Sequence, residues 1–194
     1  MSLFSNNALI NIGGDPNDEF YRYKMPPIKT QVTGRGNGIH THLLNIDEVS
    51  NSIGHPKEII MKFIAYELAS NLNQKNDSLA GNHENFIQEK IMDYINNLVL
   101  CKKCGNPETI YEITGKKKRI KLFSKCSSCG YRCEIVTSGK EDDVTRVIKG
   151  KNSSKIFNSI VKYVQDNPDA LNTKEKKEYI KETDLTFDES NLFD

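Results

Sequence analysis

Two cysteine pairs constrain the fold of this chain more than any other feature. Each pair has the spacing Cys-x-x-Cys, with Cys101 and Cys104 in the first and Cys126 and Cys129 in the second. Four thiolates at this spacing are typical ligands of one structural Zn²⁺ ion, whose tetrahedral coordination they close, so that no position is left for a substrate. The sequence therefore predicts a zinc ribbon. The ion has to hold it together, because so short a segment buries too little apolar surface by itself.

The fifth cysteine leaves one alternative open. Cys133 follows the second pair closely and could replace Cys129 as a ligand. We expect Cys133 not to be one of the four ligands. Disulfide bonds are less favoured, because they form mainly in exported proteins. Residues 1–8 lack the basic stretch followed by an apolar stretch that a secretory signal has.

Charge and composition exclude several classes of protein. The chain has 194 residues, with 27 basic and 26 acidic side chains and a net charge of +1. It is therefore not uniformly basic, as many nucleic-acid binders are. No apolar run reaches the roughly 20 residues that cross a bilayer. We expect a cytoplasmic protein that is not bound to a membrane.

Residue periodicity predicts the elements that precede the cysteines. Strands are expected at 28–33 and 40–46, joined through the glycine-rich loop Gly34–Gly38. A helix is expected to open at Pro56, with Ile60, Ile64 and Leu68 on one face. The remaining expectations are a short strand at 78–80 and a second helix at 84–99.

The predicted fold class is α+β, with a mainly antiparallel sheet packed by two helices, then the zinc ribbon and an acidic tail. Within the ribbon, strands at 109–113 and 120–124 should flank a turn. A short helix is expected after Gly150. The predicted division is a flexible N-terminal arm (1–19), an α/β domain (20–100), the ribbon with its extension (101–150), and a short helix with a largely disordered acidic tail (151–194).

A basic cluster lies at the expected tip of the ribbon hairpin. It consists of Lys116, Lys117, Lys118 and Arg119. A cationic tip of this kind suits contacts to phosphate groups. The alternative is a turn that is merely solvated.

An aromatic and cationic arm precedes the first expected strand. Arg22 stands between Tyr21 and Tyr23, and Lys24 follows, before Met25 and two prolines. Read alone, such an arginine is most often a surface residue at a strand edge. On an arm, its planar and permanently charged guanidinium can be offered to the phosphates of another protein.

The motifs of common enzymes are absent. The sequence has no HExxH helix motif, no GxxxxGK[ST] phosphate loop and no GxSxG elbow. The glycine-rich segment at 34–38 joins two expected strands instead of opening a helix, so it is not a nucleotide loop of the usual kind. The chain contains no self-contained active site, and we expect it not to be an enzyme.

Together, three stretches resemble the N-terminal domains of the eukaryotic translation initiation factor 5 family. They are Asp18–Ile28 (DEFYRYKMPPI), Gly34–Ile39 (GRGNGI) and Asn106–Thr109 (NPET). The similarity covers roughly residues 8–150. The β subunit of initiation factor 2 is a related family, and the segment 55–60 and Cys133 lean towards it. The FYRYKMP arm is typical of the factor 5 family and decides between them.

This resemblance implies a GTPase-activating protein. Its partner would be initiation factor 2, the GTPase that carries initiator tRNA to the small ribosomal subunit. GTP would be bound only by that partner, contacts to initiator tRNA and mRNA are possible, and the chain would be a monomer. The essential family arginine matches Arg22, and a supporting lysine matches Lys62. Further partner or RNA contacts are expected at Tyr21, Tyr23, Lys24, Arg35, Asn37 and the basic tip.

The chain departs from the family in two ways. A second family lysine falls at His40, whose imidazole is mostly neutral at pH 7 at its ordinary pKa of about 6.5. From the resemblance we also expect a helical-repeat domain to follow, and the 194 residues of this chain do not include one. The acidic end, 184–194, would then be a solubilising tail or a short docking peptide.

Two alternative functions remain open at this point. The first is a binding module like the β subunit, which helps to hold initiator tRNA without activating hydrolysis. The second is a zinc-ribbon protein that binds RNA or the ribosome and uses the arm only structurally. Loss of Arg22 separates activation from both.

Overall fold

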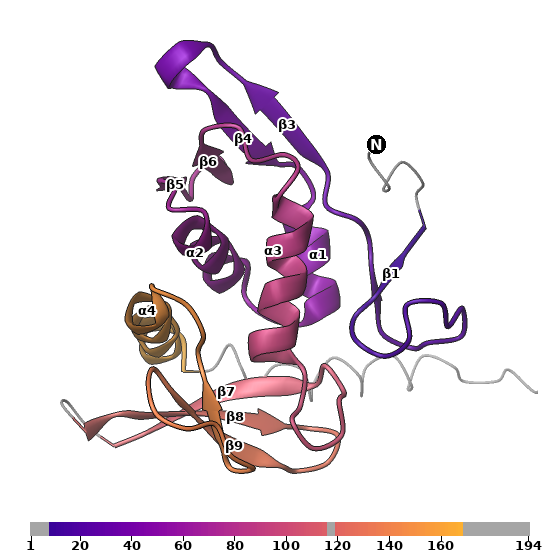
Figure 1. The fold of residues 1–194 in the computed structure, drawn as a ribbon, viewed down its shortest axis with the longest axis vertical. Coiled ribbons are helices and arrows are strands. Elements are labelled where there is room, and N and C mark those ends of the chain that lie inside the picture. The colour runs from indigo at the N-terminus through magenta and orange to yellow at the C-terminus, as the bar shows by residue number, and fades with distance from the viewer. Residues whose placement is uncertain (1–7, 116–118, 169–194) are drawn as a thin grey trace, which may run out of the picture.

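The arrangement of the chain is known from a computed structural model, which describes residues 8–115 and 119–168. A small sheet lies at one end of the molecule, the helices α1, α2 and α3 lie next to it, and the ribbon sheet lies at the other end (Figure 1). The N-terminal strands form a separate small ladder at the side, and α4 packs beside α2. This is the expected α+β architecture with antiparallel sheets.

The first sheet is antiparallel throughout and has the order β3-β4-β6-β5. Its strands are β3 (Thr30–Thr33), β4 (His40–Leu43), β5 (Leu72–Asn73) and β6 (Ser78–Ala80). A single 3-10 turn at Gly36–Gly38 closes the β3–β4 hairpin. Gly34 is required in this loop, because a Cβ there would lie 2.0 Å from the carbonyl oxygen of Gly38.

The helix α1 (Ile46–Ile53) corrects the expectation that the second strand continues to residue 46. The strand ends at Leu43 because the side chain of Asn45 takes over the neighbouring backbone groups. Its Oδ1 accepts from the Lys29 amide at 2.7 Å, and its Nδ2 donates to the Pro27 carbonyl at 2.9 Å. The helix then buries one face and ends at Gly54, whose φ of 76° is the left-handed conformation of a helix C-cap.

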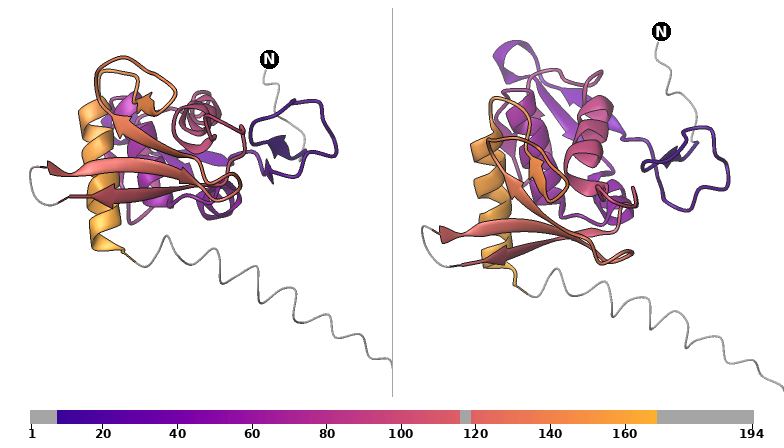
Figure 2. Two further views of the ribbon diagram at one scale, coloured as in Figure 1. Left: turned by 90° about the horizontal axis from the view of Figure 1, so that it is seen from below. Right: turned by 60° about the horizontal axis from the view of Figure 1, so that its bottom comes forward.

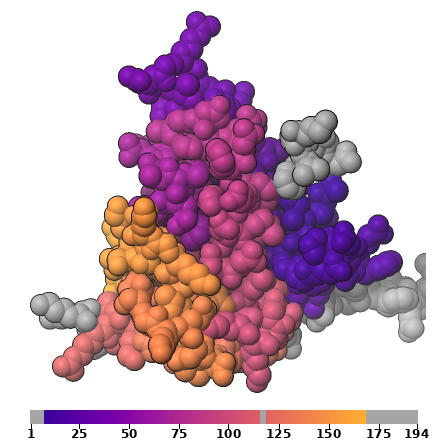
Figure 3. Space-filling view, viewed as in Figure 1, coloured from indigo at the N-terminus to yellow at the C-terminus, as the bar shows by residue number. Residues whose placement is uncertain are grey.

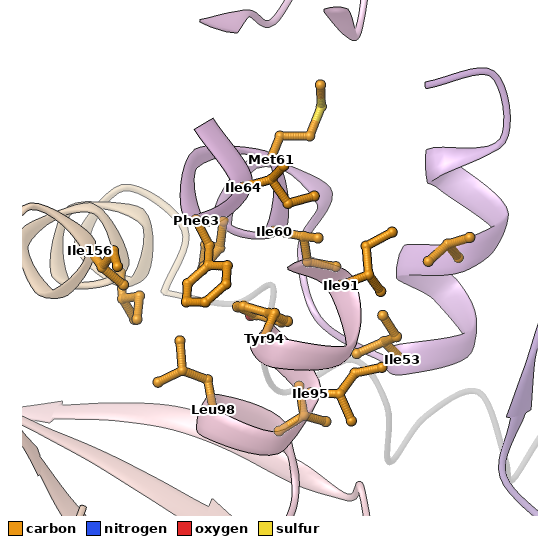
Figure 4. Packing of buried hydrophobic residues seen from close by; sticks show 14 of the residues in the cluster. Ile53, Ile60, Met61, Phe63, Ile64, Ile91, Tyr94, Ile95, Leu98 and Ile156 are labelled. Carbon is orange, nitrogen blue, oxygen red and sulfur yellow. The ribbon is translucent and has the colours of Figure 1, made fainter. Parts of the chain in front are cut away.

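The two expected helices are present. They are α2 (Lys57–Glu67), which follows Pro56, and α3 (Ile87–Tyr94), which continues as a π-helical turn (Ile95–Val99). Figure 4 shows Phe63 of α2 and Tyr94 of α3 facing each other, with Leu98 and Ile156 beside them. The rings of Phe63 and Tyr94 meet edge to face, with their centres 5.3 Å apart.

The ribbon contains more strands than expected. Strands β7 (Thr109–Thr114) and β8 (Lys121–Cys126) form the expected hairpin, β9 (Arg132–Val136) continues it, and β10 (Thr145–Val147) pairs with β9 in parallel. The chain then enters α4 (Ser153–Asp166), the helix expected after Gly150. Residues 116–118 and 169–194, which include most of the basic tip and the acidic tail, lie outside the described residues.

The N-terminal segment differs from a free arm. Strand β1 (Ile10–Asn11) pairs in antiparallel fashion with β2 (Lys24–Met25), and Ile12 and Met25 are fully buried. Residues between these strands form a loop that stands out on one side of the molecule (Figure 2). Residues 10–12, which belong to the segment 1–19 expected to be flexible, are therefore tied to the fold by this pairing and by the burial of Ile12.

Buried side chains from Ile12 to Val164 form one hydrophobic cluster, which draws on both the helical layer and the ribbon. The division of the chain into four segments stays a prediction. Within residues 8–115 and 119–168, no helix combines the length and the apolar character needed to cross a membrane.

Candidate functional site

The four paired cysteines come together at one point of the ribbon. The Sγ atoms of Cys101, Cys104, Cys126 and Cys129 all lie within 4.8 Å of one another. The Cys101–Cys129 and Cys104–Cys126 sulfur pairs are 3.6 Å and 3.7 Å apart. A tetrahedron of sulfurs about 2.3 Å from a central ion has edges of about 3.8 Å. The cluster therefore has the dimensions to hold one metal ion.

The two cysteine knuckles have the same backbone hydrogen bonds. In the first, the Cys101 amide donates to the Asn106 carbonyl and the Gly105 amide donates to the Cys101 carbonyl, both at 2.9 Å. In the second, Cys126 bonds to Tyr131 at 2.8 Å and Gly130 to Cys126 at 2.9 Å. Gly105 and Gly130 have φ values of 75° and 71°, which side chains disfavour. These turns shape each knuckle, and a bound ion would join one knuckle to the other.

The local environment moves the pKa values of these thiols in opposite directions. Burial raises the pKa of Cys126 to about 12, and burial also raises the pKa of Cys104. The hydrogen bond from the Tyr131 backbone lowers the pKa of Cys129 to about 7. Cys129 therefore forms a thiolate more readily than Cys104 and Cys126, and a bound metal ion would displace protons from those two.

Cys133 does not belong to the cluster. Its side chain is buried in β9, and its Sγ lies 3.7 Å from the carbonyl oxygen of Glu134. The cluster therefore contains the four cysteines of the two pairs, among the residues that the structure describes.

The Arg22 loop, defined here as residues 12–23, is held by hydrogen bonds at both ends. The Ile12 amide donates to the Tyr23 carbonyl at 2.9 Å. The Asn11 side chain crosses the loop and donates to the carbonyl oxygens of Asp15 and Asp18, at 2.7 and 2.9 Å. The loop thus has a defined conformation before any partner binds.

The two tyrosines beside Arg22 contact the protein itself. Tyr21 donates from its hydroxyl to the Ile12 carbonyl at 3.2 Å, and its ring lies against Gly14, where a Cβ would be 2.6 Å from a ring carbon. Tyr23 donates to the carboxylate of Glu108, in the ribbon. Burial and then this hydrogen bond raise the pKa of Tyr23 to about 12. Arg22 itself is exposed, with its guanidinium carbon 5.5 Å from the centre of the Tyr23 ring.

Phe20 is a surface residue that the sequence analysis did not single out. Its side chain is 95% exposed, the highest value among the exposed large apolar residues of the described chain. Asp18 fixes the turn beneath it by accepting from the Phe20 amide at 2.9 Å. Its position directly before Tyr21, Arg22 and Tyr23 is the sequence signal from which Phe20 could have been identified as a candidate.

The other positions named by the resemblance lie elsewhere. Lys62 is half-buried on α2, beside a shallow surface hollow that includes Tyr66 and Lys75. His40 is half-buried at the start of β4, opposite Ala80. The loop protrudes at the side opposite α2 in Figures 1 and 3, so the structure does not gather these positions around Arg22.

The remaining contact candidates are spread over three places. Arg35 and Asn37 are exposed in the β3–β4 loop, and Arg119 is exposed next to β8. Lys24 lies in β2 and donates from its side chain to the Glu19 carbonyl. Lys116, Lys117 and Lys118 fall outside the described residues, so the predicted basic tip stays a prediction.

Comparison with known proteins decides the family. The model of a domain found in initiation factors 2B and 5 matches residues 14–132, which include the loop after Gly13 and both cysteine pairs. The chain belongs to this family. It is a family of translation initiation factors, and the resemblance drawn from the DEFYRYKMPPI, GRGNGI and NPET stretches is confirmed.

Curated relatives carry the name eukaryotic translation initiation factor 5. The protein of this name from Saccharomyces cerevisiae is 41% identical over 128 residues, covering 63% of this chain and 31% of the relative. That from Mus musculus is 36% identical over 136 residues, covering 68% and 31%. A probable factor 5-1 from Arabidopsis thaliana is 37% identical over 142 residues, covering 66% and 30%. The chain thus spans about a third of the length of the relatives it matches.

Proposed function

We propose that this chain stimulates GTP hydrolysis by initiation factor 2, the GTPase that carries initiator tRNA on the small ribosomal subunit, and that Arg22 is the residue it supplies. The observation that carries this proposal is the state of Arg22. Its side chain is exposed, and it stands on a loop whose ends and two tyrosines are hydrogen-bonded to the protein. The names of the relatives support the assignment to initiation.

An arginine presented in this way suits phosphoryl transfer. Negative charge builds up on the phosphoryl and leaving-group oxygens in the transition state, and a guanidinium stabilises it. Arginines of this kind raise hydrolysis rates by roughly 10³ to 10⁵, or about 4 to 7 kcal/mol of barrier. A loop that is ordered beforehand reduces the entropy lost when the arginine enters the partner's site.

The other site residues have separate roles in this proposal. The four cysteines hold Zn²⁺, which when bound cross-links the two knuckles and takes no part in hydrolysis. Lys62 and His40 would contact other surfaces of the initiation complex, since they lie away from the loop. Arg35, Asn37 and the basic tip of the ribbon would contact RNA. The chain itself binds no GTP and acts as a GTPase-activating protein, not as an enzyme.

Single-turnover GTP hydrolysis by the partner–tRNA complex on small ribosomal subunits tests this proposal. The wild type is compared with Arg22→Ala and Arg22→Lys, and Lys162→Ala serves as the control because Lys162 is an exposed cation on α4. We expect both Arg22 variants to lose at least about a hundredfold in rate and Lys162→Ala to match the wild type.

Two outcomes would contradict the proposal. If the wild type binds the complex without stimulating hydrolysis, the chain is instead a binding module, like the β subunit of initiation factor 2. Full stimulation by Arg22→Ala would show that the loop does not supply the activating group. If Arg22→Lys stimulated hydrolysis and Arg22→Ala did not, a positive charge at this position would be sufficient for stimulation, without the geometry of a guanidinium.

A further inference from the structure

The Asn-Pro-Glu-Thr segment connects the two cysteine knuckles. The Asn106 carbonyl accepts from the Cys101 amide of the first knuckle at 2.9 Å. Its side-chain Nδ2 donates to the Ser128 hydroxyl of the second knuckle, also at 2.9 Å. The Glu108 carbonyl then accepts from the Ser127 amide at 2.8 Å. The backbone position of Glu108 is therefore tied to the residues between Cys126 and Cys129.

The side chain of Glu108 leaves the ribbon and reaches the Arg22 loop. Its Oε1 accepts the hydrogen bond from the Tyr23 hydroxyl. Tyr23 also closes the loop, because its carbonyl accepts from the Ile12 amide. A second contact lies nearby: a Cβ on Gly13 would be 2.8 Å from Cδ2 of Leu100, the residue before Cys101. The loop therefore rests on the base of the ribbon at two points.

We propose that Glu108 is a positioning residue that couples metal binding at the four cysteines to the conformation of the Arg22 loop. The path has three steps. The metal fixes the second knuckle, the knuckle holds the Glu108 backbone through Ser127, and the carboxylate holds Tyr23, the residue after Arg22. The coupling is a property of this chain alone, and only its consequence for hydrolysis rests on the proposed function.

Coupling of this kind is reciprocal. If bound metal favours the closed loop, then a closed loop favours bound metal by the same factor. A hydrogen bond to a charged acceptor is stronger than one between neutral groups, and part of its free energy is expected to reach the metal site. We therefore expect loss of the Tyr23–Glu108 bond to weaken zinc binding by about three- to tenfold.

The chain offers a matched control for this experiment. Tyr23→Phe removes the donor to the ribbon, whereas Tyr21→Phe removes a hydroxyl that bonds within the loop, to Ile12. Zinc affinity is measured by competition with a chelator for the full chain, for both variants and for Glu108→Ala. Amide hydrogen exchange of Ile12 reports closure of the loop.

We expect Tyr23→Phe and Glu108→Ala each to lower zinc affinity and to speed exchange at the Ile12 amide. The double variant should show no larger effect than either single variant. Tyr21→Phe should leave zinc affinity within about twofold of the wild type. Unchanged zinc affinity in both Tyr23→Phe and Glu108→Ala would overturn the proposal, whatever the exchange rates. Neither readout involves GTP, so coupling could be found in a protein that fails to stimulate hydrolysis, and stimulation could be found without coupling.

Discussion

The hydroxyl of Tyr94 lies 2.8 Å from Nδ1 of His55, at a fully buried point between the helices and the ribbon. The other ring nitrogen, Nε2, lies 2.8 Å from the Thr109 carbonyl, which can only accept, so Nε2 donates. In the neutral ring, Nδ1 then accepts from Tyr94, and Tyr94 accepts from Tyr111 at 3.2 Å. This chain of hydrogen bonds joins the α1–α2 connection, α3 and β7 through buried polar groups.

Removing one hydroxyl from this network should destabilise the fold. Tyr111→Phe leaves the ring in place but deletes the bond to Tyr94, and we expect a loss of about 1 kcal/mol in the free energy of unfolding. His55→Leu should cost more, because it leaves both the Tyr94 hydroxyl and the Thr109 carbonyl without this partner. Urea unfolding followed by circular dichroism measures both variants.

Tyr163→Phe is the matched control for that series. Tyr163 lies on α4, half-buried, and the hydrogen bonds found for it use its carbonyl oxygen. Its loss should change stability by less than about 0.5 kcal/mol. Equal effects of Tyr111→Phe and Tyr163→Phe would mean that the buried network contributes nothing beyond ordinary packing.

Gly14 should be required for the shape of the Arg22 loop. Its φ is 65°, and an added Cβ would lie 2.6 Å from the Tyr21 ring, which cannot move without breaking its bond to Ile12. We expect Gly14→Ala to destabilise the chain by about 1 to 3 kcal/mol, or to open the loop, as seen by faster exchange at the Ile12 amide.

Gly36→Ala separates steric clash from backbone strain. Gly36 has a similar φ of 58°, but an added Cβ would find nothing within 4 Å. This variant should therefore show only the cost of the left-handed backbone, about 1 kcal/mol. If Gly14→Ala is no more destabilising than Gly36→Ala and leaves exchange at Ile12 unchanged, the contact with Tyr21 does not hold the loop.

Local sequence signals predicted the elements that depend on residues close together in the sequence. The apolar spacing of Ile60 and Ile64 indicated α2, and the two Cys-x-x-Cys spacings predicted the cluster that the structure forms. The helix α1 was missed because Ile46 also continued the apolar pattern of the preceding strand. The boundary depends on the Asn45 side chain, which bonds to residues far earlier in the chain.

Long-range pairs were not accessible in this way. Tyr23 and Glu108 are separated by 85 positions, and nothing in either local pattern indicates the other. Strand β10 pairs with β9 in parallel across a polar connection, so its register follows from tertiary packing. The sequence thus identified Arg22 as a candidate through resemblance, while the residues that hold its loop appear only in three dimensions.

Tyr23 should titrate at higher pH than an ordinary tyrosine. Its pKa of about 12 lies above the usual value of about 10, because burial and the bond to Glu108 favour the protonated hydroxyl. The stabilisation is therefore complete below about pH 10 and is lost as the pH rises through about 12. In Glu108→Ala we expect the pKa of Tyr23 to fall but to stay above 10, since burial remains.

The titration can be followed from the ring-carbon resonances of labelled tyrosine. Tyr131 provides an internal reference, because burial is the main cause of its raised pKa and Glu108 is not among the causes. A pKa of Tyr23 that is the same in the wild type and in Glu108→Ala would show that the bond does not form in solution.

Phe20 should contribute to partner binding without contributing to the fold. An aromatic side chain that is 95% exposed on an ordered loop, two residues from an exposed arginine, has the character of an interface anchor. We expect Phe20→Ala to weaken binding to the GTPase–tRNA complex by about tenfold, and to change the free energy of unfolding by less than about 0.5 kcal/mol. Phe86→Ala, at the start of α3, removes a 52% exposed ring as a control. Equal binding by the Phe20→Ala and Phe86→Ala variants would exclude Phe20 from the interface. If Phe20→Ala binds more weakly but the rate of GTP hydrolysis at saturation is unchanged, Phe20 serves docking and Arg22 serves the chemistry.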